Sequence, residues 1–191
     1  EFLQTVNTIR RRADGSLHGD MFDGLGLVAA CQDNGCNFKD RRALIIGAGG
    51  AGTAIAHAVA SAGVEAIGIC DIDARRCNTL IERLRSADFN TVPAQPSASC
   101  FDIVINATPL GMRAHDPLPL DVESLRPHTF VGDVVTLPER PPLILHAQQR
   151  GCKTSTDTEM FLKVRDLMVD FLLADPSEAT CIDDQSNRHH S

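Results

Sequence analysis

The sequence lacks the long apolar runs and the excess of basic residues that mark two large classes of protein. No stretch approaches the roughly 18 consecutive apolar residues of a membrane-spanning helix, so we expect no membrane partner. The opening residues, EFLQTVNTIRRR, have no basic segment followed by an apolar core and do not resemble a signal peptide. Lysine and arginine number 18 against 25 acidic residues, giving a net charge of -7. Because nucleic acids and anionic lipids favour basic surfaces, nucleic acid is not an expected partner either.

Metal-binding and hydrolase motifs are also missing. The seven cysteines are scattered, none forms a C-x-x-C pair, and no group of histidines and cysteines has zinc spacing. We therefore expect reduced thiols, a cytoplasmic location and no metal site. The sequence shows no Ser/His/Asp order and no nucleophile elbow, the usual signs of a serine hydrolase.

What the sequence does contain is an alternation of apolar strands and helices. Its 43% hydrophobic content is that of a globular domain with a core. We expect strands at 4–9, 43–46, 64–70, 89–92, 101–107 and 130–135. We expect helices at 50–62, 73–87, 141–151 and 157–174, and one that ends near Asn34 after a loop over residues 17–22. The alternation predicts an α/β fold with a Rossmann-type, doubly wound parallel sheet.

A glycine-rich loop follows the strand at 43–46. The segment GAGGAG places Gly47, Gly49 and Gly52 at dinucleotide-binding spacing, and Asp71 ends the next strand nineteen positions after Gly52. The first glycine permits a tight turn, the second lets the backbone approach a pyrophosphate, and the third lets the helix pack closely on the strand. The alternative is a structural turn in an α/β fold that binds no nucleotide.

Asp71 bears on the choice of cofactor. A carboxylate at this position accepts hydrogen bonds from the ribose hydroxyls of NAD and repels the 2′-phosphate of NADP. Arg75 and Arg76 follow on the next helix and would favour NADP if they reached the same place. The sequence therefore favours NAD and leaves NADP open.

Three groups of motifs together resemble the shikimate/quinate dehydrogenase family. They are VNTI followed by GDMFDGLG, then GAGGAG, then VINATPLGM followed by VGDVV. The resemblance runs from residue 5 to about residue 173 and matches the latter two-thirds of the family's usual length. It implies the end of a substrate domain and a linking helix at 1–38, an NAD(P)-binding Rossmann domain at 39–152, a C-terminal helix at 153–174 that packs back on the substrate domain, and a frayed tail at 175–191.

The resemblance also implies a reaction and a site. The family interconverts 3-dehydroshikimate and shikimate, or quinate and 3-dehydroquinate, by hydride transfer with a nicotinamide cofactor, so the implied partner is a small cyclic hydroxy acid. A Lys–Asp pair lies beside the reacting oxygen. Asp23 matches the aspartate, and Asn7 matches an asparagine that binds a substrate hydroxyl. The lysine belongs to a segment before the VNT motif and has no counterpart here. From the residues alone, a helix N-cap is the favoured explanation of Asp23, and it is the family resemblance that favours the catalytic role.

Cofactor contacts are expected along the loops that follow the strands. The polar residues after the strand at 101–107 would bond the cofactor, and the residues after them would shape the wall beside the nicotinamide ribose. The full set of expected cofactor-binding residues is Gly47, Ala48, Gly49, Gly50, Ala51, Gly52, Asp71, Arg76, Asn106, Thr108, Pro109 and Val134. A homodimer is possible and is not indicated by any motif.

Several positions depart from the family pattern on the substrate side. Met21 and Phe22 precede Asp23 where the family has Asn-Thr, and Thr136 replaces a tyrosine. Asp157 and Val164 replace a glycine and a glutamine. Losing polar donors changes which hydroxyl pattern a site accepts. A second hypothesis is therefore a non-catalytic or altered-substrate NAD-binding paralogue, and a third, disfavoured by the VNTI and GDMFD motifs, is an unrelated Rossmann reductase.

Overall fold

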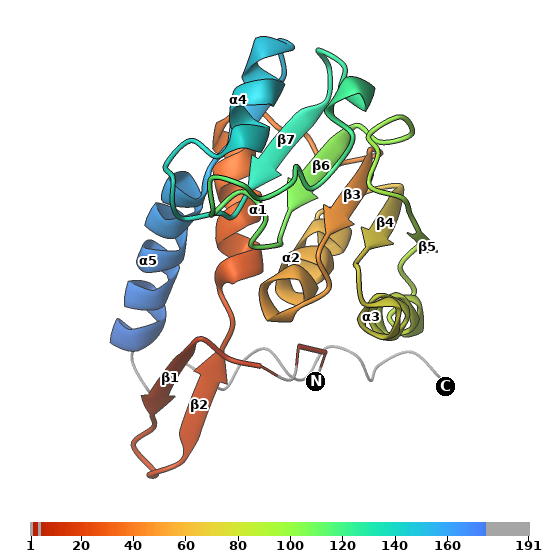
Figure 1. Cartoon of the computed structure of the whole chain (residues 1–191). Helices are drawn as coiled ribbons and strands as arrows, with labels where there is room; N and C mark the ends of the chain where they lie inside the picture. The colour runs from red at the N-terminus through yellow and green to blue at the C-terminus, as the bar shows by residue number, and fades with distance from the viewer. Residues whose placement is uncertain (1, 4, 175–191) are drawn as a thin grey trace.

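The computed structural model describes residues 2–3 and 5–174 and shows a parallel sheet flanked by helices, with a small hairpin at one end (Figure 1). No helix in these ranges is long and apolar enough to cross a bilayer. In chain order, the elements are β1 (Thr8–Arg11), β2 (Leu17–Asp20), α1 (Asp23–Asp33), β3 (Arg42–Ile46), α2 (Gly50–Ser61), β4 (Ala66–Cys70), α3 (Ala74–Ser86), β5 (Thr91–Pro93), β6 (Ile103–Asn106), the 3-10 turn η1 (Val122–Ser124), β7 (Phe130–Asp133), α4 (Pro142–Gln149), β8 (Lys153–Ser155) and α5 (Asp157–Leu173).

The main sheet has six strands in the order β5-β4-β3-β6-β7-β8, and every pairing between them is parallel. The chain moves outward from β3 to β4 and β5, then returns to the other side of β3 as β6. The strand order thus reverses between β3 and β6. This topology confirms the predicted Rossmann-type sheet, in which ligands bind where the order reverses, beyond the carboxyl ends of the strands.

Apolar side chains on the two faces of the sheet form two separate cores. On one face, residues of α1, α2, α3 and α5 pack against alternate residues of the strands, such as Ile45 and Ile105. On the other face, α4 and the segment around η1 pack against the intervening residues, such as Leu44 and Val104. Both faces of the central strands are therefore buried, which explains their nearly continuous apolar sequences.

The ends of the helices follow from local sequence. The side chain of Asp73 accepts hydrogen bonds from the backbone N–H groups of Arg75 (2.9 Å) and Arg76 (3.3 Å) and so caps α3. Thr156 and Glu159 form a capping box at the start of α5. Gly63, with φ of 88°, follows the end of α2 in the left-handed region that glycine adopts most readily.

Two short strands were not expected. Residues 17–20 form β2, which pairs antiparallel with β1, so the prediction of a loop there was wrong. The same pairing places the first strand at Thr8–Arg11 and not at 4–9. At the other end of the chain, β8 pairs parallel with β7, so the sheet extends beyond residue 152. The expected tail at 175–191 lies outside the described residues.

Helices α1 and α5 pack closely and connect the hairpin to the sheet. A Cβ on Gly26 would lie 2.3 Å from Cγ2 of Val164, so only glycine fits at this crossing. Farther along, the ring of Phe171 lies 5.4 Å from that of Phe22 and 5.1 Å from that of His18, and Arg10 lies over the same ring. The C-terminal helix thus returns to the hairpin, as Figure 1 also shows.

Candidate cofactor and substrate site

The carboxyl ends of the parallel strands bring the expected site residues to one edge of the sheet. The register pairs Ile46 with Cys70 on one side of β3 and with Asn106 on the other. Asn106 in turn pairs with Asp133. The glycine loop and the loops after β4, β6 and β7 therefore begin at the same level, as the arrowheads in Figure 1 show.

The glycine loop has the shape that a diphosphate site requires. Gly47 has φ of 106°, and a Cβ there would lie 2.7 Å from the carbonyl oxygen of Ala107. A Cβ on Gly52 would lie 2.0 Å from the carbonyl oxygen of Gly47. At Gly49 and Gly50, by contrast, a Cβ would meet nothing within 4 Å. Gly47 and Gly52 permit tight packing of the backbone. Gly49 and Gly50 leave the N-terminus of α2 open, where unpaired N–H groups attract an anion.

Asp71 is tied directly to this loop. Its Oδ2 accepts the backbone N–H of Ala48 (2.6 Å), and its Oδ1 accepts the backbone N–H of Asp73 (2.7 Å). Each carboxylate oxygen accepts more than one hydrogen bond, so Asp71 retains acceptor capacity toward ribose hydroxyls. Ile72, the next residue, is fully exposed.

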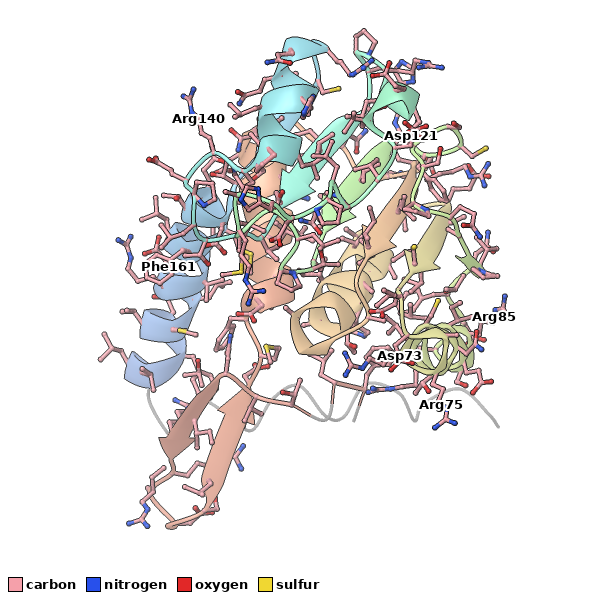
Figure 2. All side chains as sticks on the ribbon, viewed as in Figure 1. Asp73, Arg75, Arg85, Asp121, Arg140 and Phe161 are labelled. Carbon is pink, nitrogen blue, oxygen red and sulfur yellow. The ribbon has the colours of Figure 1, made fainter. Side chains whose placement is uncertain are left out.

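The nearby arginines point elsewhere. Nε of Arg76 lies 3.5 Å from Oδ2 of Asp73, in an exposed ion pair. Figure 2 shows Asp73 and Arg75 at the N-terminal end of α3, with the Arg75 side chain directed away from the sheet. The carboxylate of Asp71 is thus the charged group joined to the glycine loop.

The loop after β6 is organised by Asn106. Its Oδ1 accepts hydrogen bonds from the N–H (3.1 Å) and the hydroxyl (2.7 Å) of Thr108, while its Nδ2 donates to the carbonyl of Leu110 (3.2 Å) and to Oδ1 of Asp133 (3.0 Å). Asn106 is completely buried, and its amide has no donor or acceptor left over. Thr108 and Val134 are half-buried, and Pro109 is exposed.

Asn7 and Asp23, sixteen residues apart, meet beside the same edge. Nδ2 of Asn7 donates to Oδ1 of Asp23 over 2.6 Å, and Oδ1 of Asn7 accepts the N–H of Phe22 over 3.3 Å. Phe22 is the N-cap residue of α1, and Asp23 lies in the first turn. The N-cap explanation of Asp23 was therefore wrong. Within residues 2–3 and 5–174, Oδ2 of Asp23 makes no hydrogen bond, so this oxygen is available to a ligand.

One further carboxylate, Asp157, is electrostatically linked to Asp23, and a second, Asp133, is linked to Asp157. Asp157 begins α5, and burial and the negative charge of Asp23 raise its pKa, while a hydrogen bond to Thr136 acts in the opposite direction. Asp133 is completely buried, and burial raises its pKa to about 7, with a smaller contribution from the charge of Asp157. In the sequence, Asp157 is visible only as a departure from the family pattern, and the one signal of Asp133 is an acid inside the apolar segment FVGDVV.

Comparison with known proteins agrees with this geometry. The family model described as shikimate/quinate 5-dehydrogenase matches residues 29–111. A shikimate dehydrogenase (NADP(+)) of Rubrobacter xylanophilus is 38% identical over 162 residues, which is 82% of this chain and 57% of that protein. The chain belongs to the shikimate/quinate dehydrogenase family. It spans less than two-thirds of the length of this relative.

Solved structures of the family and of a related reductase have the same fold. Quinate dehydrogenase from Corynebacterium glutamicum in complex with NAD superimposes with a TM-score of 0.82 at 30% identity, over 92% of this chain and 66% of that one. The ligand-free 5-ketofructose reductase of Gluconobacter sp. strain CHM43 gives 0.81 at 27% identity, with the same coverage. The shikimate/quinate dehydrogenase fold is therefore shared with a protein named for another substrate.

Proposed function

We propose that this shikimate/quinate dehydrogenase family member binds NAD and contributes to hydride transfer between the cofactor and a ring hydroxyl of shikimate, quinate or a closely related cyclic hydroxy acid. The observation that carries the proposal is the Asn7–Asp23 hydrogen bond, 2.6 Å long, at the same edge as the glycine loop. Helix α1, which Asp23 begins, packs against α2, which follows the glycine loop, and this packing supports a hydroxyl-binding pair next to the proposed cofactor site.

The residues of the glycine loop fit a dinucleotide. Gly49 and Gly50 leave open space where side chains would obstruct a diphosphate, and the N-terminus of α2 supplies its N–H groups and partial positive charge. Asp71 would hold the adenosine ribose, and Thr108, Pro109 and Val134 would line the nicotinamide end. When bound, the nicotinamide supplies or accepts the hydride.

The Asn7–Asp23 pair would act on the proton side of the reaction. Oxidation of an alcohol removes the O–H proton as hydride leaves carbon, so an oriented acceptor beside the oxygen lowers the barrier. The hydrogen bond from Asn7 fixes the Asp23 carboxylate and leaves its other oxygen for a substrate hydroxyl or a lysine. The family resemblance places that lysine before Asn7, where residues 1–6 contain none. Turnover is therefore to be tested in a polypeptide that includes this lysine, whereas cofactor binding can be tested in the 191-residue chain.

An altered substrate is the second candidate, and Asp157 favours it. Asp157 is half-buried, and it lies close enough to Asp23 for the Asp23 charge to raise the pKa of Asp157. Its carboxylate adds an acceptor and a negative charge beside the proposed substrate position. Such a group favours hydroxyl donors and disfavours an acidic substituent nearby. The similarity to a 5-ketofructose reductase is compatible with this possibility.

Two measurements test the proposal. Titration calorimetry of the 191-residue chain with NAD⁺ and NADP⁺ should show tighter binding of NAD⁺, and binding of neither would refute the cofactor assignment. NADH formation by the lysine-containing polypeptide should then be followed with shikimate and quinate side by side. Cofactor binding without turnover of either acid would favour the altered-substrate or non-catalytic alternative.

A further inference from the structure

Asp133 and Asn106 form a buried polar pair between two loops of the cofactor site. Both residues have no exposed surface, and they lie opposite each other on the adjacent strands β7 and β6. Oδ1 of Asp133 accepts hydrogen bonds from Nδ2 of Asn106 and from the N–H of Val135, each 3.0 Å long. The pair thus joins the end of β6 to the loop that follows β7.

Asn106 also forms hydrogen bonds with the loop at residues 107–111. Its amide contacts the backbone at Thr108 and Leu110, and the Thr108 hydroxyl then accepts the N–H of Leu110 over 3.1 Å. Other hydrogen bonds hold the ends of this loop, from the N–H of Ala107 to Ile46 and from the N–H of Gly111 to Asp116. Within the loop, the hydrogen bonds at Thr108 and Leu110 run through Asn106 and the Thr108 hydroxyl. The orientation of one amide group therefore determines much of the conformation of the loop.

A carboxyl group at position 133 is costly to bury. Its Oδ2 has no hydrogen-bond partner within the described ranges, and Asp157 at the start of α5 is the charged group that acts on it. Replacing buried charged or polar groups by apolar residues of similar volume is often neutral or stabilising. Packing alone therefore does not explain an aspartate here, whereas the need to hold the Asn106 amide does.

We propose that Asp133 is a positioning residue for the nicotinamide end of the cofactor, acting through Asn106 on the loop at 107–111. It cannot touch a ligand itself because its side chain is completely buried. The inference rests on the proposed function, since that function assigns this loop to the nicotinamide end. The diphosphate and adenosine end depends instead on the glycine loop and Asp71.

The test compares two ligands that differ at one end. ADP-ribose contains the diphosphate and adenosine parts of the cofactor, and NADH adds the nicotinamide. In Asp133→Leu, the acceptor for Asn106 is lost, so the Kd for NADH should rise about tenfold while that for ADP-ribose changes by less than about twofold. The ratio of the two Kd values is insensitive to partial unfolding, because unfolding weakens the binding of both ligands by the same factor.

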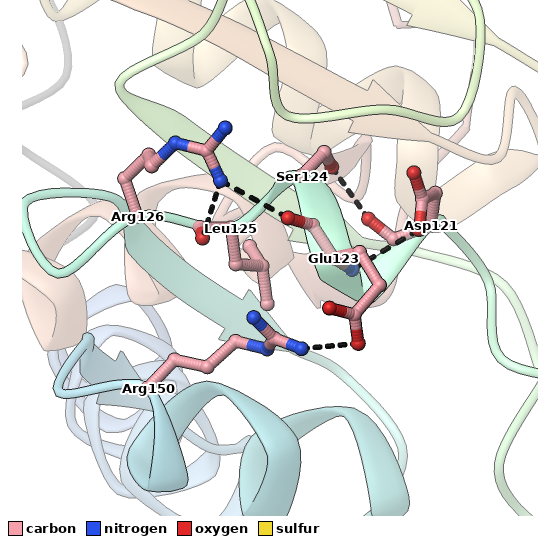
Figure 3. Close-up of polar contacts among 6 residues, drawn as sticks. All are labelled: Asp121, Glu123, Ser124, Leu125, Arg126 and Arg150. Atoms are coloured by element: carbon pink, nitrogen blue, oxygen red, sulfur yellow. Dashed lines mark hydrogen bonds and ion pairs between the residues drawn. The ribbon is translucent and has the colours of Figure 1, made fainter.

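Two further variants act as controls. Asp133→Asn retains an oxygen acceptor and should restore most of the NADH/ADP-ribose ratio. Ser124→Ala removes a buried hydroxyl that accepts the N–H of Ala98 (2.8 Å) and belongs to the polar network around η1 (Figure 3). That network precedes β7 and lies at the opposite edge of the sheet, so this variant should leave the ratio unchanged despite a comparable loss of buried polarity.

The wild-type chain provides an independent measurement if Asp133→Leu does not fold. In an NMR titration between about pH 5 and pH 9, the Asp133 carboxyl carbon, the Asn106 side-chain amide and the backbone amides of Thr108 and Leu110 should shift with one midpoint. Loop amides that do not follow Asp133 would overturn the inference, as would equal changes in both Kd values. If the wild-type protein bound ADP-ribose but not NADH, the inference about Asp133 would be wrong, and the assignment of the diphosphate site would remain supported. If the wild-type protein bound neither ligand, the proposed function itself would be refuted.

Discussion

The backbone N–H of Ala48 donates a hydrogen bond of 2.6 Å to Oδ2 of Asp71, which joins the glycine loop to the end of β4. One carboxylate thus serves two purposes. It braces the glycine loop, and under the proposed function it retains acceptor capacity for the adenosine ribose. Because the same group does both, a change at Asp71 should affect both cofactor selectivity and the geometry of the loop.

Replacing Asp71 by alanine should lower NAD⁺ affinity about tenfold and shift the ratio of NAD⁺ to NADP⁺ affinity toward NADP⁺, since the repulsion of a 2′-phosphate is removed. Titration calorimetry with both cofactors measures the ratio. The matched control is Asp73→Ser, which removes a carboxylate two residues away and keeps a side chain that caps α3. An unchanged ratio in Asp71→Ala would contradict the role given to Asp71.

Alanine substitutions in the glycine loop should separate packing from binding. At Gly52 the new Cβ would lie 2.0 Å from a backbone oxygen, so Gly52→Ala should lower the free energy of unfolding by about 3 kcal/mol. Gly49→Ala meets open space and should leave that free energy nearly unchanged while weakening NAD⁺ binding about tenfold. Chemical denaturation and calorimetry check the two effects, and full NAD⁺ affinity in a folded Gly49→Ala protein would argue against a diphosphate at this point.

Asp133 should make stability depend on pH in a direction opposite to most carboxylates. Its ordinary pKa is 3.8 and its value in the fold is about 7. A raised pKa means that the folded state binds the proton more tightly, so its stabilising contribution is complete below about pH 4 and lost as the pH rises through about 7. The difference in unfolding free energy between wild type and Asp133→Asn should fall by up to roughly 4 kcal/mol over this range.

Urea denaturation of the two proteins at a series of pH values measures that difference. Comparing wild type with Asp133→Asn cancels the contributions of other titrating groups, including Asp14, whose pKa is lowered by hydrogen bonds from Ser16. A difference that stays constant with pH would show that Asp133 remains ionised in the fold.

Asp23 should matter for turnover far more than for cofactor binding. In the lysine-containing polypeptide, Asp23→Asn should lower kcat by about 100-fold or more, because an acceptor beside the reacting hydroxyl is lost. The Kd for NAD⁺ should stay within about twofold, since the glycine loop and Asp71 are untouched. Asp33→Asn, at the far end of α1 in an exposed pair with Lys163, is the matched control for kcat and Kd. Equal kcat in wild type and Asp23→Asn would remove Asp23 from the mechanism.

The longer elements were predictable because each carries its own local signal. Apolar runs identify β3, β4, β6 and β7, and caps or glycines mark the ends of α2 and α3. The two strands that escaped prediction, β2 and β8, have four and three residues with polar sequences, LHGD and KTS. They form because a neighbouring strand offers unpaired backbone groups, and no local sequence pattern contains that information.

The sequence by itself determined the parallel sheet, the glycine loop and the acid that follows it, since these depend on periodicity and on the backbone freedom of a few residues. Tertiary structure decided which side chains meet. Asn7 reaches Asp23 only because β1 and β2 pair, and Asn106 reaches Asp133, twenty-seven residues away, only because β6 and β7 are aligned in register. Such contacts join segments distant in the chain, and they form when the pairing of strands brings those segments together.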